Sequence, residues 1–129
     1  MEHKKRIMIV DDNVIDQMIT ARILKMNYTH GDIVTMMSAA EALDYIDHHL
    51  DKPELLPNLI LLDLDMPSIN GFGFLERFNC YADSLKATCP VVVLTASNVL
   101  SDIEKIKSHP DVVKLIAKPL SKESLALVI

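Results

Sequence analysis

The sequence predicts an α/β domain built on an open, parallel, five-stranded sheet with helices on both faces. Five short apolar segments lack the polar alternation of half-exposed strands, as expected when helices cover both faces of a sheet. Helical patterns separate these segments, and the repeated strand–helix order favours right-handed crossovers between parallel strands. The chain has 129 residues, half of them hydrophobic, so we expect one compact domain that spans residues 1–129.

The five predicted strands are short aliphatic runs bounded by polar or turn-forming residues. Runs of this length suit strands better than helices, and the last run is the shortest. In chain order they are Ile7 to Val10, Ile33 to Met37, Leu59 to Leu62, Val91 to Leu94 and Leu115 to Ala117.

Helices are predicted over residues 14–26, 39–50, 71–82, 101–109 and 121–129. In the first, apolar residues recur at spacings of three and four, which is typical of a helix that packs one apolar face on a sheet. Those residues are Ile15, Met18, Ile19, Ile23 and Met26. The next two helices have comparable apolar faces, formed by Ala39, Ala42, Leu43 and Ile46, and by Phe74, Leu75 and Phe78.

Composition argues against several classes of function. The net charge is −5 and the only basic cluster is "HKKR" at residues 3–6, so we expect no direct binding to nucleic acid. The apolar runs are far shorter than the ~18 residues that cross a bilayer, and nothing resembles a signal peptide. Cys80 and Cys89 form no C-x-x-C pair, which suits a reducing compartment. We therefore expect a cytoplasmic protein without membrane insertion.

Ionisable and hydroxyl side chains follow the predicted strands. In an open parallel sheet, ligands bind outside the carboxyl ends of the strands, so these residues should share one rim. They are Asp11 and Asp12 after the first strand, Asp63 and Asp65 after the third, Thr95 after the fourth and Lys118 after the fifth.

This set of side chains predicts a site for a phosphoryl group. Three carboxylates at one rim must bind a cation or share protons, and oxygen ligands make Mg²⁺ the natural candidate. A lysine and a threonine hydroxyl can hold the oxygens of an anion. One carboxylate is then placed to attack the phosphoryl group, and Asp63 is the acid closest to a strand end.

Four motifs, in the same order as in the family, resemble the receiver domain of two-component response regulators. They are "IMIVDDN" (7–13), "LILLDLDMPSINGFGFL" (59–75), "VVVLTAS" (91–97) and "IAKPL" (116–120). The resemblance covers essentially the whole chain and suggests a stand-alone receiver. It implies the flavodoxin-like receiver fold, with strand order 2-1-3-4-5, and a phosphorelay switch rather than an enzyme that turns over a substrate.

The resemblance also implies roles for the acids. Asp63 would accept a phosphoryl group from a sensor histidine kinase or a histidine phosphotransfer protein. Asp12 and Asp63 would hold Mg²⁺ directly and Asp11 through water, with the backbone carbonyl of Asp65 completing the protein ligands. What the Asp65 carboxylate does stays open, as does the identity of the downstream protein target.

Further residues would form the switch and its supporting loops. Thr95 would bind the phosphoryl group and swing inward, paired with Lys118. Leu115 stands where the family often has an aromatic residue, so any coupled movement would be a smaller repacking. The implied loop residues are Pro67, which would stiffen the loop after Asp63, Gly71, where that loop enters the third helix, and Pro119, whose bond to Lys118 is expected to be cis.

Two alternatives remain open. "LLDLDMPS" (61–68) also resembles the first motif of haloacid-dehalogenase-type phosphohydrolases, with Asp63 as nucleophile and Asp65 as general acid and base. In those enzymes this strand comes first in the chain, whereas Asp11 and Asp12 precede it here. The other alternative is a degenerate receiver that binds partners without phosphorylation. Repeated turnover of a phosphate monoester would favour the first, and absence of Mg²⁺-dependent labelling the second.

Overall fold

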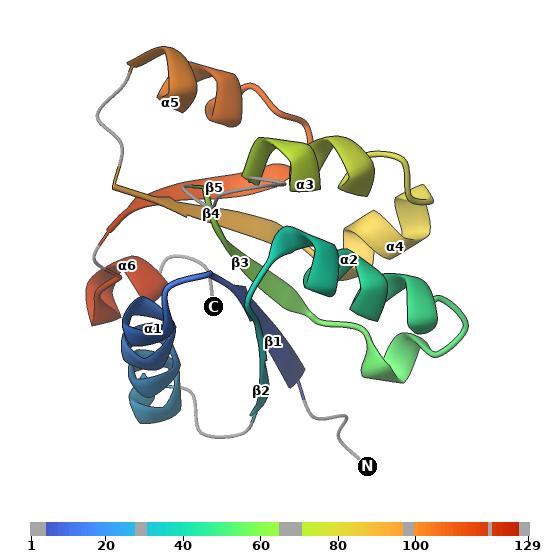
Figure 1. The fold of residues 1–129 in the computed structure, drawn as a ribbon, viewed down its shortest axis with the longest axis horizontal. Coiled ribbons are helices and arrows are strands. Elements are labelled where there is room, and N and C mark those ends of the chain that lie inside the picture. The colour runs from blue at the N-terminus through green and yellow to red at the C-terminus, as the bar shows by residue number, and fades with distance from the viewer. Residues whose placement is uncertain (1–4, 28–30, 65–70, 97–99, 119, 127–129) are drawn as a thin grey trace.

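A computed structural model gives the structure of residues 5–27, 31–64, 71–96, 100–118 and 120–126. Five parallel strands form one sheet of order β2-β1-β3-β4-β5, which confirms the predicted fold class and strand order (Figure 1). The strands are β1 (Lys5–Val10), β2 (Gly31–Met36), β3 (Leu59–Asp63), β4 (Val91–Thr95) and β5 (Val112–Ala117).

The helices in the described ranges are α1 (Val14–Asn27), α2 (Ala39–His48), α3 (Gly71–Phe78), α4 (Asp83–Thr88), α5 (Leu100–Lys107) and α6 (Lys122–Ala126), and a 3-10 turn (Pro53–Leu55) precedes β3. Helix α4 was not predicted. The third predicted helix ends at Phe78 because the chain turns there: the Tyr81 N–H donates to the Phe78 carbonyl, and the Tyr81 ring packs edge-on against Phe78.

Strand β5 begins at Val112, three residues before the predicted start. Three of its six residues are half-buried, Val113 and Ala117 are exposed, and Ile116 is buried. The strand is this exposed because it lies at the edge of the described sheet, next to β4. Lys114 is therefore tolerated within it and interrupts the apolar run that the prediction relied on.

Two apolar clusters cover the two faces of the sheet. Alternate strand residues point to opposite faces, so Met8 packs with α2, α3 and α5, whereas Ile9 packs with α1 and α6. Figure 1 shows the same division, with α1 and α6 side by side. Helix α1 contributes one fully buried apolar side chain, Leu24, to its cluster.

The predicted apolar face of α1 is wrong in its direction. Ile15, Met18, Ile19 and Met26 are 48–72% exposed, and of the predicted stripe only Ile23 packs partly on the sheet. The inward face instead carries Gln17, Thr20 and Leu24.

Polar contacts explain this orientation of α1. The Gln17 side-chain amide lies 3.1 Å from the carbonyl oxygen of Met36 and 3.4 Å from that of Asp11, and donates to both. These carbonyls lie at the carboxyl ends of β2 and β1, and the Met36 carbonyl also accepts from the Asp11 N–H, so Gln17 adds a side-chain donor to buried backbone oxygens. On the inward face of α1, Gln17 thus has hydrogen-bond partners, and the more strongly apolar stripe of Ile15, Met18, Ile19 and Met26 faces solvent.

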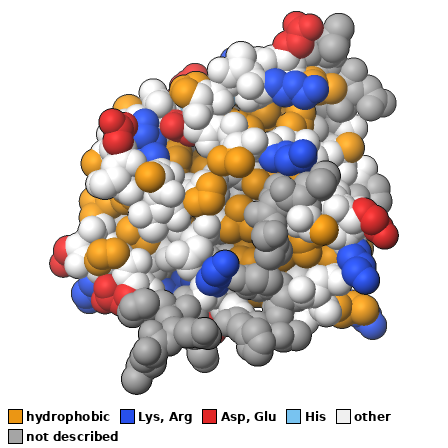
Figure 2. Space-filling view, turned by 180° about the vertical axis from the view of Figure 1, so that it is seen from behind, with side chains coloured by type: hydrophobic (Ala, Val, Ile, Leu, Met, Phe, Trp, Pro, Cys, Tyr) orange, Lys and Arg blue, Asp and Glu red, His pale blue; other side chains and the backbone are white. Residues whose placement is uncertain are grey.

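Single exposed apolar side chains occur elsewhere too. Seen from behind, hydrophobic side chains reach the surface across the middle of that face, with Lys and Arg side chains among them (Figure 2). A surface that is partly apolar is ordinary in globular proteins. The α1 stripe differs because several large apolar side chains follow one another along a single helix.

The register of the sheet aligns the ends of the strands. Asp63 pairs with Leu94, and Thr95 pairs with Ala117, so the residues that follow β1, β3, β4 and β5 meet at one rim. None of the described helices is both long and apolar enough to cross a membrane.

The orientation of α1 predicts unequal effects of apolar substitutions. Leu24→Ala should lower the free energy of unfolding by about 2–5 kcal/mol, because it opens a cavity in the core. Met18→Ala should change it by less than about 0.5 kcal/mol, because Met18 is exposed. Urea denaturation checks both values, and equal losses for the two variants would contradict the observed orientation.

Candidate functional site

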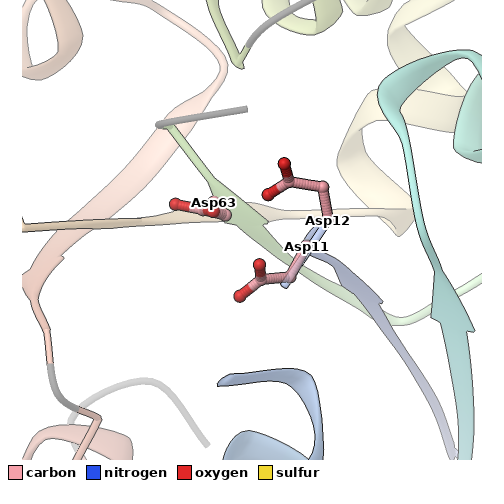
Figure 3. A group of neighbouring side chains, drawn as sticks. All are labelled: Asp11, Asp12 and Asp63. Carbon is pink, nitrogen blue, oxygen red and sulfur yellow. The ribbon is translucent and has the colours of Figure 1, made fainter. Parts of the chain in front are cut away.

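The site begins with three carboxylates at the carboxyl rim. Asp11 and Asp12 follow β1 and Asp63 is the last residue of β3, and β1 pairs with β3. One oxygen from each carboxylate lies within 4.8 Å of the others. Figure 3 shows the three side chains extending from the adjacent ends of the two strands. The predicted acids are therefore brought together.

Two of these acids are almost fully buried: Asp11 is 2% and Asp63 is 3% exposed, whereas Asp12 is half-buried. Burial raises the pKa of Asp11 to about 6, and the neighbouring charge of Asp63 adds to the rise. The Asn13 N–H, which donates to Asp11 Oδ1 at 2.9 Å, and the Lys118 ammonium act in the opposite direction. The rim thus holds more negative charge than its hydrogen bonds compensate.

Lys118, which follows β5, is the cation that reaches this cluster. Its Nζ lies 3.0 Å from Asp63 Oδ1 and 3.6 Å from Asp11 Oδ2. Burial lowers the pKa of Lys118, but its contacts with Asp63, Asp11 and Asp16 outweigh burial and raise it. The side chain therefore stays charged beside the acids.

Asp16, in the first turn of α1, is a site residue that the sequence reasoning missed. Its Oδ2 lies 3.4 Å from Lys118 Nζ. The available signal was its position: α1 begins at the rim, so an acid in the first turn can reach a lysine that points into the cluster.

Thr95 ends β4, next to Lys118. It is 4% exposed, and its carbonyl accepts a 2.8 Å hydrogen bond from the Lys118 N–H. The two side chains predicted to hold a phosphoryl group therefore come from neighbouring strand ends. Leu115 lies further back on β5, opposite Val93, and is half-buried against the cluster that α2, α3 and α5 cover.

Gly71 begins α3 close to the residue that follows Asp63. A Cβ at this position would lie 2.8 Å from Leu64 Cα and 3.2 Å from the Leu64 carbonyl oxygen. Only glycine allows this approach without a backbone shift, so Gly71 lets α3 start directly against the end of β3.

Three predicted residues lie outside the described residues: Asp65, Pro67 and Pro119. The carbonyl ligand from Asp65, the stiffening by Pro67 and the cis Lys118–Pro119 bond therefore stay predictions.

The donor set suits a hard divalent cation. Three carboxylates provide oxygen ligands only, and one ammonium leaves most of their charge uncompensated. Oxygen ligands, incomplete protein coordination and an excess of negative charge are the features of a protein Mg²⁺ site. Asp11, Asp12 and Asp63 are the residues that would hold the ion.

Comparison with known proteins points in the same direction. Residues 7–129 match the family model described as the response regulator receiver domain. The chain is 34% identical over 119 residues to the probable methanogenesis regulatory protein FilR2 of Methanothrix harundinacea (strain 6Ac), with 92% of this chain and 75% of that protein covered. It is 30% identical over 138 residues to the two-component response regulator ARR17 of Arabidopsis thaliana, with 84% and 86% covered.

Among solved structures, a two-component response regulator from Cytophaga hutchinsonii matches with a TM-score of 0.87 at 22% identity. The match covers 98% of this chain and 94% of that one, and it shows that the two share a fold.

The raised pKa of Asp11 predicts a pH-dependent stability. Without metal, the folded chain holds this proton more tightly than the unfolded chain does. The group therefore lowers the free energy of unfolding as the pH rises from about 4 to about 6, by an amount of the order of 2–3 kcal/mol. Mg²⁺, which needs the ionised form, should recover the loss at neutral pH.

Urea denaturation in EDTA, compared between wild type and Asp11→Asn across this pH range, isolates the contribution. Asp11→Asn should gain stability relative to wild type as the pH rises. Parallel pH profiles for the two proteins would contradict the prediction.

Proposed function

The chain belongs to the response regulator receiver domain family, and on this premise we propose that it is a phosphoacceptor switch in two-component signalling. The observation that carries the proposal is the convergence of Asp63 with two further acids and Lys118 at one rim. The phosphoryl donor would be a histidine of a sensor kinase or of a phosphotransfer protein, and the cytoplasm is the expected location.

Asp63 would act as the nucleophile. One of its carboxylate oxygens forms the bond to phosphorus while the phosphorus–nitrogen bond of the phosphohistidine breaks, and the electron pair of that bond stays on the imidazole. When bound at this rim, Mg²⁺ offsets the negative charge of the acids and of the phosphoryl group. Burial of Asp63 limits the conformations of the carboxylate and so favours in-line attack.

Lys118 and Thr95 would hold the transferred group. Lys118 Nζ is already 3.0 Å from Asp63 Oδ1, so an ammonium N–H can pass to a phosphoryl oxygen with little movement. The Thr95 hydroxyl would donate to a second oxygen from the neighbouring strand end. The Asp65 carbonyl would complete the metal ligands, with Pro67, Gly71 and Pro119 shaping the loops around them.

The phosphorylation signal would be passed to a downstream protein through the edge of the sheet that β5 forms. Phosphorylation adds roughly −1.5 to −2 charges, and the inward shift of Thr95 and Lys118 would bias α5, β5 and α6 between two arrangements. Leu115, half-buried on β5, would repack in this change. A hollow of about 320 Å³, which Leu115 lines together with Lys107, Val112, Val113 and Lys114, is a surface that a downstream protein with acidic and apolar side chains would fit.

The histidine donor would dock on the exposed stripe of α1. This helix starts beside Asp11 and Asp12, so a protein that brings a phosphohistidine to Asp63 must cover its first turns. Val14, Ile15, Met18 and Ile19 are exposed there, and contiguous exposed apolar side chains are typical of protein-binding surfaces.

The phosphohydrolase alternative is less well supported. The family match covers residues 7–129, and Asp63 ends the third strand of the chain rather than the first. We therefore expect at most one phosphoryl group per chain and no turnover.

The proposed phosphoacceptor function predicts that one residue, Asp63, takes a covalent label. With Mg²⁺, acetyl phosphate should label the chain to at most one group, and EDTA or Asp63→Asn should abolish the label. Asp83→Asn, which alters a fully exposed acid, is the matched control and should label like wild type. Mass spectrometry measures the added mass. A label that survives Asp63→Asn would refute the assignment, and repeated hydrolysis of a phosphate monoester would establish the enzyme instead.

The α1 stripe predicts a difference between protein and small-molecule donors. The double variant Met18→Ser/Ile19→Ser should slow transfer from a phosphorylated histidine phosphotransfer protein by about tenfold or more, because it removes apolar contacts with the docked donor protein. Labelling by acetyl phosphate should not change. Leu50→Ser alters an exposed apolar residue beyond the end of α2 and serves as the control. Equal slowing with both donors would place the effect at the site and not at the docking surface.

A further inference from the structure

Lys118 has a third carboxylate partner that the function proposed above does not use. Besides Asp63 and Asp11, its Nζ lies 3.4 Å from Asp16 Oδ2. The side chain of Asp16 is 45% exposed, whereas those of Asp63 and Asp11 are 4% and 3% exposed. Asp16 also belongs to a different element, the helix α1.

Two of the three carboxylates, those of Asp63 and Asp16, lie within hydrogen-bond distance of the ammonium, and Asp11 adds a longer ion pair. A lysine carries three N–H groups and no acceptor, and its three carboxylate contacts lie at 3.0, 3.4 and 3.6 Å. An anionic phosphoryl group on Asp63 would therefore compete with the carboxylates for the positive charge and the N–H groups of Lys118. Asp16 is not part of the cluster of Asp11, Asp12 and Asp63, and its carboxylate would compete with the anion for the charge of Lys118.

A capping role does not account for this contact. The Asp16 N–H donates to Asn13 Oδ1 at 3.0 Å, so Asn13 caps the start of α1 and the Asp16 carboxylate is left to Lys118. An acid in a first turn also favours the helix dipole, but that effect acts on the stability of α1 and not on the ammonium.

We propose that Asp16 is a positioning residue: it holds the Lys118 ammonium towards α1 and so weakens the binding of an anion at Asp63 by Lys118. The inference rests on the proposed phosphoacceptor function. Neutralising Asp16 has two effects of the same sign: it frees an N–H of Lys118, and it removes a negative charge near the incoming anion. Both strengthen anion binding. Because Asp16 is half-exposed, water moderates the effect to about two- to fivefold.

The test compares Asp16→Asn with Asp16→Glu, which keeps the charge, and with Asp44→Asn, which removes an exposed acid from α2. The probe is beryllofluoride, an anion that mimics a phosphoryl group on a carboxylate, at saturating Mg²⁺. Titration calorimetry should show that Asp16→Asn binds it about two- to fivefold more tightly than wild type. Asp16→Glu should fall at or near wild type, and Asp44→Asn should not differ from it.

A second measurement separates this role from a structural one. In the metal-free protein, the ¹⁵Nζ resonance of Lys118 should shift in Asp16→Asn and not in Asp44→Asn, whatever small change in melting temperature accompanies either variant. Unchanged or weaker beryllofluoride binding in Asp16→Asn, or an unmoved Lys118 resonance, would overturn the proposal. If wild type binds no beryllofluoride and takes no label from acetyl phosphate, the phosphoacceptor function fails and this inference fails with it.

Discussion

The contact between Lys118 and the buried acids is the constraint on which this rim depends. Asp63 ends β3 and Lys118 follows β5, and these two strands are not neighbours, since β4 lies between them. The long lysine side chain has to pass the end of β4 to place Nζ 3.0 Å from Asp63. It can do so because the parallel register aligns Asp63 with Leu94 and Thr95 with Ala117. A one-residue slip would turn these side chains to the other face of the sheet.

Among the described residues at this rim, the carboxylates outnumber the one ammonium that contacts them. One ammonium faces Asp11, Asp63 and Asp16, and Asp12 adds a fourth acid nearby. Burial penalises charge on Asp11 strongly enough to raise its pKa to about 6. Such a cluster is poised to respond to a cation or to an anion that Lys118 can bind, since either one redistributes the contacts of the lysine. Because Lys118 directly follows β5, the proposed switch would transmit such a change in contacts to that strand.

Much of the fold and the centre of the site could be predicted from the sequence, because buried parallel strands read as unbroken apolar runs and their carboxyl ends share one rim. Asp11, Asp63, Thr95 and Lys118 follow from that rule. Periodicity alone could not orient α1, since the hydrogen bonds of Gln17 to the backbone oxygens of Met36 and Asp11, which place it on the inner face, leave no apolar signal in the sequence. Asp16 was missed for a related reason: a first-turn acid has the same pattern whether it meets solvent or a lysine 102 positions away.

The orientation of α1 joins the exposed stripe to the chemistry of the rim. Since the polar contacts of α1 face inward, its apolar side chains are free to meet another protein, and Asp16 lies at the boundary between the two faces. Water now moderates the attraction of Asp16 for Lys118, because Asp16 is half-exposed. A protein that covers the stripe would exclude that water and strengthen the attraction, as charges interact more strongly at low dielectric. If the proposed function is correct, a protein docked on α1 and an anion at Asp63 would therefore influence each other through Lys118 and a single carboxylate, that of Asp16.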